Sequence, residues 1–189
     1  MRFFKKSVIS GEKIFGQKVR KRRRAAISEY GRQLREKQKL KALYNLRERQ
    51  FKKYIKEVMT ERGKKGVDIV SLLIQKLELR LDNVVFRLGF ASSRSQARQL
   101  VNHGHFLVNG RKVNIPSFEL RKGDQVQVRA ASLKKNFFKK IQETLKKHKI
   151  PSWLNFDIQK MEAKVVGLPS FEEAQLPVQI PLIFEFYSR

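Results

Sequence analysis

Residues 80–113 read RLDNVVFRLGFASSRSQARQLVNHGHFLVNGRKV, and three local patterns in them predict structure. Apolar residues recur at helical spacing from Leu81 to Leu88, and the glycine that follows is a typical helix stop. Ser93, with a glutamine three residues later, is a typical N-cap for a second helix. Asn109-Gly110 between two apolar runs predicts a tight β-hairpin. The stretch therefore predicts two short helices followed by a hairpin.

Positive charge is concentrated on this stretch. We expect the two helices to expose four guanidiniums, and two more cations follow the hairpin turn. These cations are Arg80, Arg87, Arg94, Arg98, Arg111 and Lys112. The charged residues of either helix alone could simply face solvent without binding a partner. Together, the three pieces favour a small RNA-binding module that lies along a phosphate backbone.

The three pieces resemble the S-four RNA-binding domain, and the sequence on both sides resembles the ribosomal protein S-four family. Upstream, SEYGRQLREKQK at residues 28–39 and ERQF at residues 48–51 match the consecutive basic helices of that family. Downstream, PSWL at residues 151–154 and FEFYSR at residues 184–189 match its C-terminal end. The likeness holds in order from about residue 17 to the last residue, whereas the opening MRFFKK does not match the usual start of the family.

The resemblance implies a structural constituent of the small ribosomal subunit that is not an enzyme and needs no cofactor. Its expected partners are neighbouring small-subunit ribosomal proteins and the small-subunit rRNA, in which the family binds a multi-helix junction of the 5′ domain and nucleates assembly of the subunit body. Members of the family lie near the mRNA entry path, so mRNA is a further expected partner. The expected location is the cytoplasmic ribosome, with an organellar ribosome left open.

The composition agrees with a nucleic-acid partner. The 189 residues include 43 Lys and Arg against 17 Asp and Glu, which gives a formal charge of +26 and a pI near 10.7. Residues 1–66 carry +17, residues 67–149 carry +11 and residues 150–189 carry −2. No apolar run approaches the ~20 residues of a membrane span, and the absence of cysteine excludes disulfides and cysteine-bound metal clusters. We therefore expect RNA, and no membrane, to contact the first three quarters of the chain.

We expect an α+β fold with four parts. These are a basic N-terminal arm (1–27), a helical domain (28–78), the S-four module of short helices on a small antiparallel sheet (79–140) and a C-terminal helix with strands that closes the structure (141–189). The arm contains RKRRR at residues 20–24, a run that repels itself and predicts disorder until phosphates neutralise it. A targeting peptide is an alternative interpretation of the arm, although serine is scarce there.

Capping residues and apolar spacing predict the helices outside the module. Ser28 predicts a helix to about Tyr44, and Asn45 predicts a break before a helix over residues 47–62. An apolar helix is expected through Val70 and Leu77, directly before the module.

The part of the chain after the hairpin is expected to contain strands and one Lys-rich helix. Gln125–Arg129 alternates as a strand, and Ser132 is the expected cap of the helix, which Pro151 ends. Residues 156–166 and 180–187 are also expected to be strands, the second an edge strand because a proline stands near its start.

The candidate RNA contacts are the cations and polar residues expected at the surface of these elements. They are Arg20, Lys21, Arg22, Arg23, Arg24, Arg32, Arg35, Lys37, Lys39, Arg47, Arg49, Lys53, Arg80, Arg87, Ser93, Arg94, Arg98, His103, His105, Asn109, Arg111 and Lys112. Tyr44, Phe51 and Tyr54 occur at helical spacing, so we expect them in the core rather than stacked on bases.

The sequence shows no catalytic or metal-binding constellation. His103 and His105 lack a cysteine or carboxylate set to complete a metal site, so we expect them to face RNA or to pack against the hairpin. Arg80-Leu81-Asp82 matches a tripeptide of pseudouridine synthases, in which the aspartate is catalytic. Here the aspartate falls in the first turn of a predicted helix, where an acid stabilises the helix dipole.

Two other functions are weighed against the ribosomal one. An RNA-modifying enzyme would use the module to hold its substrate, and it would need a complete catalytic domain, which the sequence does not show. A free-standing S-four-domain factor for stress or ribosome rescue would recognise tRNA or stalled subunits. Such factors usually consist of the module and a basic tail, whereas this chain has the flanking sequences of the ribosomal family.

Overall fold

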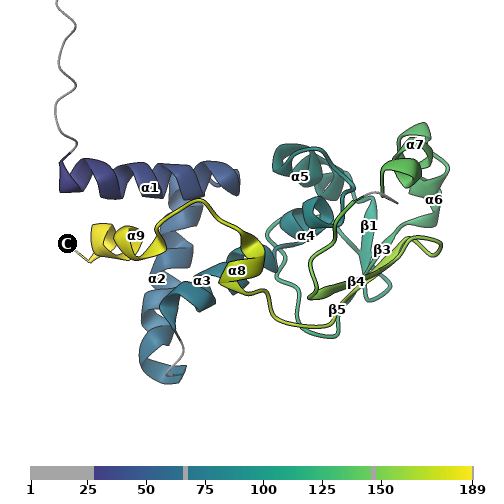
Figure 1. Cartoon of the computed structure of the whole chain (residues 1–189). Coiled ribbons are helices and arrows are strands. Elements are labelled where there is room, and N and C mark those ends of the chain that lie inside the picture. Colours follow the sequence, from purple (N-terminus) through teal and green to yellow (C-terminus); the bar gives the residue numbers. More distant parts are fainter. Residues whose placement is uncertain (1–27, 66–67, 146–147, 189) are drawn as a thin grey trace, which may run out of the picture.

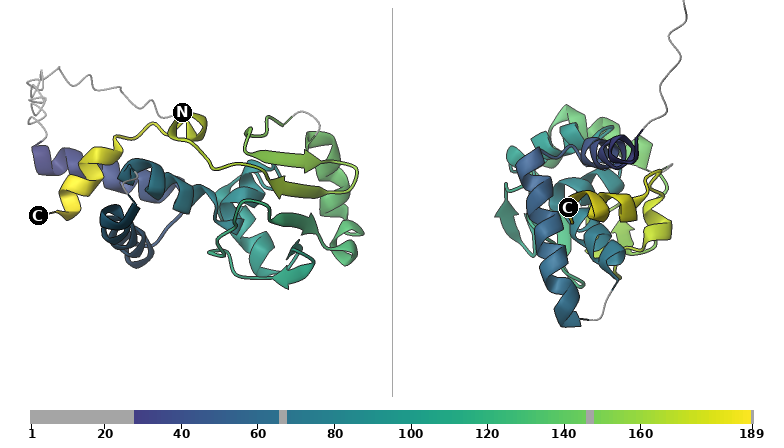
Figure 2. Two further views of the ribbon diagram at one scale, coloured as in Figure 1. Left: turned by 90° about the horizontal axis from the view of Figure 1, so that it is seen from below. Right: turned by 90° about the vertical axis from the view of Figure 1, so that its left-hand side faces the viewer.

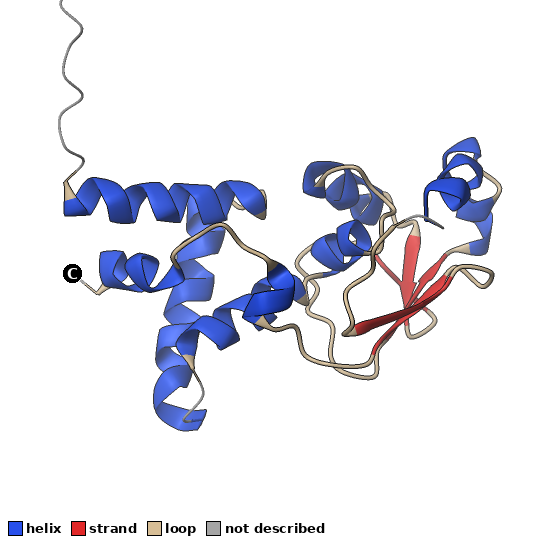
Figure 3. Ribbon diagram, viewed as in Figure 1, coloured by secondary structure: helices blue, strands red, loops and turns tan. Residues whose placement is uncertain are grey.

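The computed structural model describes residues 28–65, 68–145 and 148–188, which form two lobes (Figures 1 and 2). The first, here called the helical lobe, contains the N-terminal helices and the last helix of the described chain. The second, the sheet lobe, contains the strands with the helices around them, and Figure 3 shows the described strands gathered at this end. Each lobe has its own hydrophobic core.

The helical lobe is built from segments that lie far apart in the sequence. Its elements are α1 (Glu29–Leu43), α2 (Glu48–Lys65), α3 (Ile69–Glu78), α8 (Phe171–Ala174) and α9 (Ile180–Tyr187). In its core, Leu40, Phe51 and Leu73 of the first three helices pack together with Ile183 and Phe184 of α9. The apolar side chains of α1 to α3 in this core are therefore covered in part by α9.

The sheet lobe follows the chain from α4 to β5. Its elements are α4 (Leu81–Arg87), α5 (Arg94–Asn102), β1 (Phe106–Val108), β2 (Arg111–Val113), β3 (Gln125–Val128), α6 (Ala130–Leu133), α7 (Asn136–Leu145), β4 (Leu154–Asp157) and β5 (Glu162–Val165). The strands form one antiparallel sheet in the order β2-β1-β3-β5-β4. Alternating burial along β1 and β3 gives the sheet an apolar face, and its residues share one core with those of α4, α5 and α7.

Several local predictions are confirmed. The hydroxyls of Ser28 and Ser93 accept backbone hydrogen bonds and cap α1 and α5. Asn45 adopts the left-handed conformation, with φ of 50°, between α1 and α2. Asn109 and Gly110 have φ of 49° and 77°, as a type I′ turn requires, and they join β1 to β2. Short-range chemistry therefore determines these helix starts and turns.

Three predicted elements are wrong. Residues 180–187 form helix α9 instead of an edge strand, because Pro181 is compatible with the first turn of a helix and the apolar side chains pack into the helical-lobe core. Residues 156–166 are not a single strand but contain the end of β4 and all of β5, with a turn between them. Ser132 is not a cap: it is buried in α6, with its hydroxyl 2.9 Å from Nδ1 of the buried His105.

The chain crosses between the lobes twice. It first passes from α3 into α4 around residues 78–81, and after β5 it returns to the helical lobe. There α8 packs against α3, and α9 lies along α1 (Figure 1). The last 49 residues of the sequence are thus divided between the two lobes, because β4 and β5 complete the sheet while α8 and α9 complete the helical lobe.

Candidate nucleic-acid interface

Glu78, the last residue of α3, is fully buried where the lobes meet. Its carboxylate accepts hydrogen bonds from Tyr44 Oη (2.5 Å), Asn83 Nδ2 (2.8 Å) and Arg87 Nη2 (2.7 Å). Burial by itself would raise the pKa of this carboxyl, but Arg87, helped by Tyr44 and Asn83, outweighs burial and holds the pKa below its ordinary value. Burial and the charge of Glu78 raise the pKa of the Tyr44 hydroxyl. Glu78 is therefore ionised at neutral pH, and Tyr44 is its protonated donor.

Asp82, in the first turn of α4, is a second buried carboxylate at the junction. Arg80 donates two hydrogen bonds to it, Nε to Oδ1 at 3.0 Å and Nη2 to Oδ2 at 2.8 Å. Arg98 of α5 donates from Nε and Nη2 to the same Oδ2, at 3.1 and 3.0 Å. The remaining terminal nitrogen of Arg80 donates to Tyr54 Oη of α2 at 2.5 Å. Asp82 is thus held between two guanidiniums, and both of its oxygens accept hydrogen bonds from positively charged donors.

Arg94 and Arg98 reach from α5 to the turn between α1 and α2. The Arg94 guanidinium lies between two rings, 4.6 Å from the centre of Tyr44 and 4.6 Å from that of Phe86. Its Nε donates to Asn83 Oδ1 at 2.7 Å, while Arg98 Nη1 donates to the Asn45 carbonyl at 2.6 Å.

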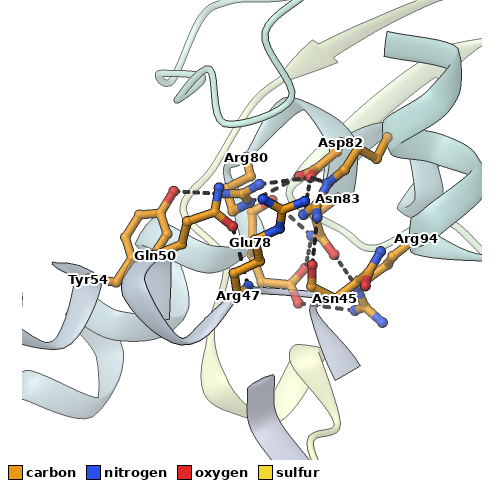
Figure 4. Close-up of polar contacts among 10 residues, drawn as sticks. Asn45, Arg47, Gln50, Tyr54, Glu78, Arg80, Asp82, Asn83 and Arg94 are labelled. Atoms are coloured by element: carbon orange, nitrogen blue, oxygen red, sulfur yellow. Dashed lines mark hydrogen bonds and ion pairs between the residues drawn. The ribbon is translucent and has the colours of Figure 1, made fainter. Parts of the chain in front are cut away.

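These linked contacts, most of which Figure 4 shows, are here called the carboxylate network. Its members are Tyr44, Asn45, Tyr54, Glu78, Arg80, Asp82, Asn83, Arg87, Arg94 and Arg98.

The prediction that the four arginines of residues 80–98 are exposed is wrong. Arg80 is buried, and the side chains of Arg94 and Arg98 are only 14% and 23% exposed. Arg87 uses Nε and Nη2 on Glu78, and Nη2 also donates to the carbonyl of Ala174 in α8. The sides of α4 and α5 that carry these residues face the helical lobe instead of solvent. Charged residues at helical spacing look the same in the sequence whether they face solvent or a polar contact with another lobe.

Lys37, another candidate RNA contact, is also internal. It is buried, and its Nζ donates to Glu48 at 2.8 Å and lies 4.4 Å from the centre of the Phe186 ring. Glu48 further accepts from Lys41 and from the Tyr187 hydroxyl. Hydrogen bonding to Lys37 is the main reason why the pKa of Glu48 falls to about 2, and Lys41 adds to the effect against a smaller cost of burial. This cluster fastens α9 to α1 and α2.

Three candidates near the hairpin use their polar groups within the protein. His105 is buried, and burial, followed by the charge of Lys135, lowers its pKa. It therefore packs beneath the surface instead of facing RNA. The Asn109 side-chain amide donates to Asp124, and its oxygen accepts a hydrogen bond from the backbone N–H of Gln125. These two bonds connect the hairpin to β3. Ser93 uses its hydroxyl as the cap of α5.

The other described candidates are exposed. They are Arg32, Arg35, Lys39, Arg47, Arg49, Lys53, His103, Arg111 and Lys112. Lys39 and Lys53 form ion pairs with acids on their own helices, at 2.6 and 3.8 Å. The exposed cations among the candidates thus lie mainly on α1 and α2, with a second group on β2. The candidates at positions 20–24 lie outside the described residues.

Glu78 and Asn83, which occupy the centre of the network, were not predicted from the sequence patterns. A signal for Glu78 was present, because it is a lone acid at the end of the apolar run IVSLLIQKLE of α3. An acid in such a position is normally paired when it is buried. Neither residue is suited to bind a nucleic acid directly, since both are buried and bonded within the protein.

A metal site, a membrane span or a catalytic aspartate would each require particular features of the described residues. Within 28–65, 68–145 and 148–188, no group of three or more His, Cys, Asp or Glu side chains could hold a metal ion. No helix in these ranges is long and apolar enough to cross a membrane. Asp82, the match to a catalytic aspartate, is enclosed by Arg80 and Arg98 and so has no room for a substrate.

Comparison with known proteins gives a match for each lobe. The Ribosomal protein S4/S9 N-terminal domain matches residues 5–74, and the S4 domain matches residues 79–126. The Small ribosomal subunit protein uS4 of Syntrophobacter fumaroxidans is 50% identical over 166 residues, which are 88% of this chain and 78% of that protein. The protein of the same name from Herpetosiphon aurantiacus is 50% identical over 169 residues (88% and 78%), and that of a Sulfurihydrogenibium species is 49% identical over 174 residues (92% and 83%). Because this identity extends over most of both sequences, the chain belongs to the family of small ribosomal subunit protein uS4.

Proposed function

We propose that this chain is a structural component of the small ribosomal subunit, that it binds the 5′ domain of the small-subunit rRNA and that it contacts neighbouring ribosomal proteins. The observation that carries this proposal is the identity of about one half, across both lobes, to proteins named for that subunit. The formal charge of +26 supports an RNA partner. A catalytic step has no part in this function.

Binding would depend on shape and on phosphate contacts. Folded RNA has a deep, narrow major groove that side chains do not read, so proteins mostly contact its phosphates and 2′-hydroxyls. The exposed Arg47 and Arg49 at the start of α2, with Arg111 and Lys112 on β2, are suited to such contacts. Release of cations bound to the RNA supplies much of the binding free energy.

Two lobes that hold separate RNA helices can also fix the angle between those helices. This property suits a protein that binds a multi-helix junction early and nucleates assembly of the subunit body, as the family resemblance implies. The same resemblance supports a position near the mRNA entry path as part of this proposal. The acidic C-terminal quarter, with a net charge of −2, is better suited to protein partners than to RNA.

The two rival functions are less well supported. An RNA-modifying enzyme would need Asp82 to reach a substrate, but both of its oxygens are occupied by arginines. A rescue factor built from the module alone would lack the first lobe, whereas the ribosomal N-terminal family match covers residues 5–74 of this chain.

Sedimentation of ribosomal subunits tests the proposed function. Tagged protein in cell extracts should migrate with the small subunit at one copy per subunit, and it should stay there after a high-salt wash that removes a loosely bound translation factor measured in the same gradient. Loss in the wash, or a small fraction of occupied subunits, would instead favour the rescue factor.

A further inference from the structure

The two lobes meet across a polar junction. The described cores share no residue: one contains side chains of α1 to α3, α8 and α9, and the other contains side chains from Leu79 to Val165. Between α2 and the segment 117–119 lies a cleft of about 280 Å³ that is lined by Tyr54, Arg80 and Glu119. Apolar packing thus stabilises each lobe, whereas the contacts of the carboxylate network connect them.

Members of the network reach across the junction at several points. Arg98 Nη1 donates to the Asn45 carbonyl, the Arg94 guanidinium covers the Tyr44 ring, and Arg80 donates to Tyr54. Farther round the junction, Arg87 joins Glu78 to the carbonyl of Ala174 in α8. The Asn45 carbonyl is presented by a left-handed turn, so the position of the contact depends on that backbone geometry.

These contacts are directional. A guanidinium is a rigid planar fork, and Arg98 uses all three of its nitrogens, two on Asp82 and one on Asn45. Such a side chain holds the α1–α2 turn at one distance and one angle from α5. Because its donors are turned into the protein, it has little left to offer a phosphate.

We propose that the carboxylate network fixes the angle between the two lobes, and that Arg94 and Arg98 are positioning residues for RNA binding instead of phosphate ligands. The proposal rests on the proposed function, since it names how the RNA-binding surfaces of the two lobes are held in register. Exposed cations such as Arg47 and Arg111 lie on opposite sides of the junction, so a change in angle would separate contacts that one RNA has to satisfy together.

Lysine at position 98 separates the two roles. Lysine keeps the charge that a phosphate needs, but it lacks the fork that bridges Asp82 and Asn45. Arg98→Lys and Arg98→Gln should therefore weaken binding to a small-subunit 5′-domain RNA by a similar factor, ~10-fold or more at fixed salt. The matched control is the exposed Arg111, where Arg111→Gln should weaken binding more than Arg111→Lys does, because lysine keeps the charge that a phosphate contact needs.

The angle itself can be measured without RNA. The chain has no cysteine, so spin labels can be placed uniquely at the exposed positions Lys56 of α2 and Lys122 before β3. Pulsed electron resonance should give one narrow distance for the otherwise unchanged protein and a broadened or shifted distance for Arg98→Lys. Fluorescence of Trp153, which is buried in the sheet-lobe core, should stay unchanged and show that this lobe is folded.

The outcomes are distinct. An unchanged narrow distance in Arg98→Lys, or full RNA affinity in that variant with a loss only in Arg98→Gln, would overturn the proposal. Unfolding of the sheet lobe in both Arg98→Lys and Arg94→Lys would overturn it as well, because the network would then be a core element. Failure of the wild-type protein to bind the RNA would count against the proposed function and leave the distance measurement as a separate test of the angle.

Discussion

Asp82 is buried between Arg80 and Arg98, and removal of its charge would leave both guanidiniums without their shared anion. Breaking a buried pair from one side typically costs about 3 to 5 kcal/mol. We therefore expect Asp82→Asn to lower the free energy of unfolding by an amount in that range, well above the ~1 kcal/mol of a residue that only complements a helix dipole. The change in the free energy of unfolding can be measured by urea titration, with Trp153 fluorescence as the signal.

The matched control for this prediction is Asp157→Asn, at an exposed position in the same lobe. The amide oxygen of the asparagine can still accept from the N–H groups of Gln159 and Lys160. The ion pair that is lost, with the Lys160 ammonium at 4.0 Å, is exposed and contributes little. A change below ~0.5 kcal/mol is expected there. Equal small effects for both variants would mean that the Asp82 ion pairs do not stabilise the folded protein.

Glu48 gives a pH dependence with a definite sign. Its pKa is lowered from 4.5 to about 2, so the folded state favours the ionised form. Its contribution is complete above the ordinary pKa and is lost as the pH falls toward the folded value. The difference in unfolding free energy between wild type and Glu48→Gln should therefore be largest near neutral pH and shrink below pH ~4.5. The size should be ~0.5 to 1 kcal/mol, because the carboxylate is 48% exposed and screened by solvent.

Urea titrations of both proteins over this pH range measure the difference. Added salt should reduce it at neutral pH, as expected of a partly exposed ion pair. A difference that stays constant with pH would contradict the role of the Glu48 charge.

The hairpin between β1 and β2 combines a backbone requirement with side-chain hydrogen bonds. Asn109 has φ of 49° and is bonded to Asp124 and Gln125. Asn109→Ala should destabilise the sheet lobe by ~2 kcal/mol, since alanine loses about 1 kcal/mol in the left-handed region and the hydrogen bonds contribute about 1 kcal/mol more. Asn109→Gly removes only the hydrogen bonds, so it should recover roughly half of the loss. Denaturation midpoints from Trp153 fluorescence give both values. A glycine variant as unstable as the alanine variant would mean that the left-handed backbone of Asn109 does not contribute to the loss of stability.

Helix starts and turns that depend on neighbouring residues could be predicted from the sequence. Elements that depend on residues far away in the sequence could not. Ser28, Ser93 and Asn109-Gly110 act through neighbouring backbone groups, so their positions could be taken from the sequence. Helix α9 depends on α1 and α2, which lie more than 100 residues away, and its aromatic and branched residues alone resemble a strand. The exposed arginines of α2 and the hairpin were predicted as exposed. The arginines of α4 and α5 were predicted to be exposed and are not, because their partners are the buried acids and Asn83 together with groups of the helical lobe.

The distribution of charge over the whole molecule predicts a strong salt effect on RNA binding. If about 6 to 10 phosphates are contacted, affinity should fall ~10³- to 10⁵-fold between about 50 and 200 mM salt, with the duplex-DNA rule extended to RNA. Replacement of Arg47 or Arg49 by Gln should reduce the slope of log affinity against log salt by ~0.7 to 0.9 each. Filter binding with a 5′-domain RNA at several salt concentrations gives these slopes. A dissociation constant that does not change with salt would exclude an electrostatic interface.

The return of the chain to its first lobe also sets an order of events during synthesis. The core residues of the sheet lobe are contiguous in sequence from Leu79 to Val165, so this lobe has its full complement of side chains first. The core of the helical lobe includes Ile180, Ile183 and Phe184, and Gln33 of α1 donates a hydrogen bond to Glu185, 152 positions later. Although α1 to α3 are translated before the sheet lobe, their own lobe is therefore completed after it, and until α9 emerges the apolar faces of these helices have to be kept from other nascent chains.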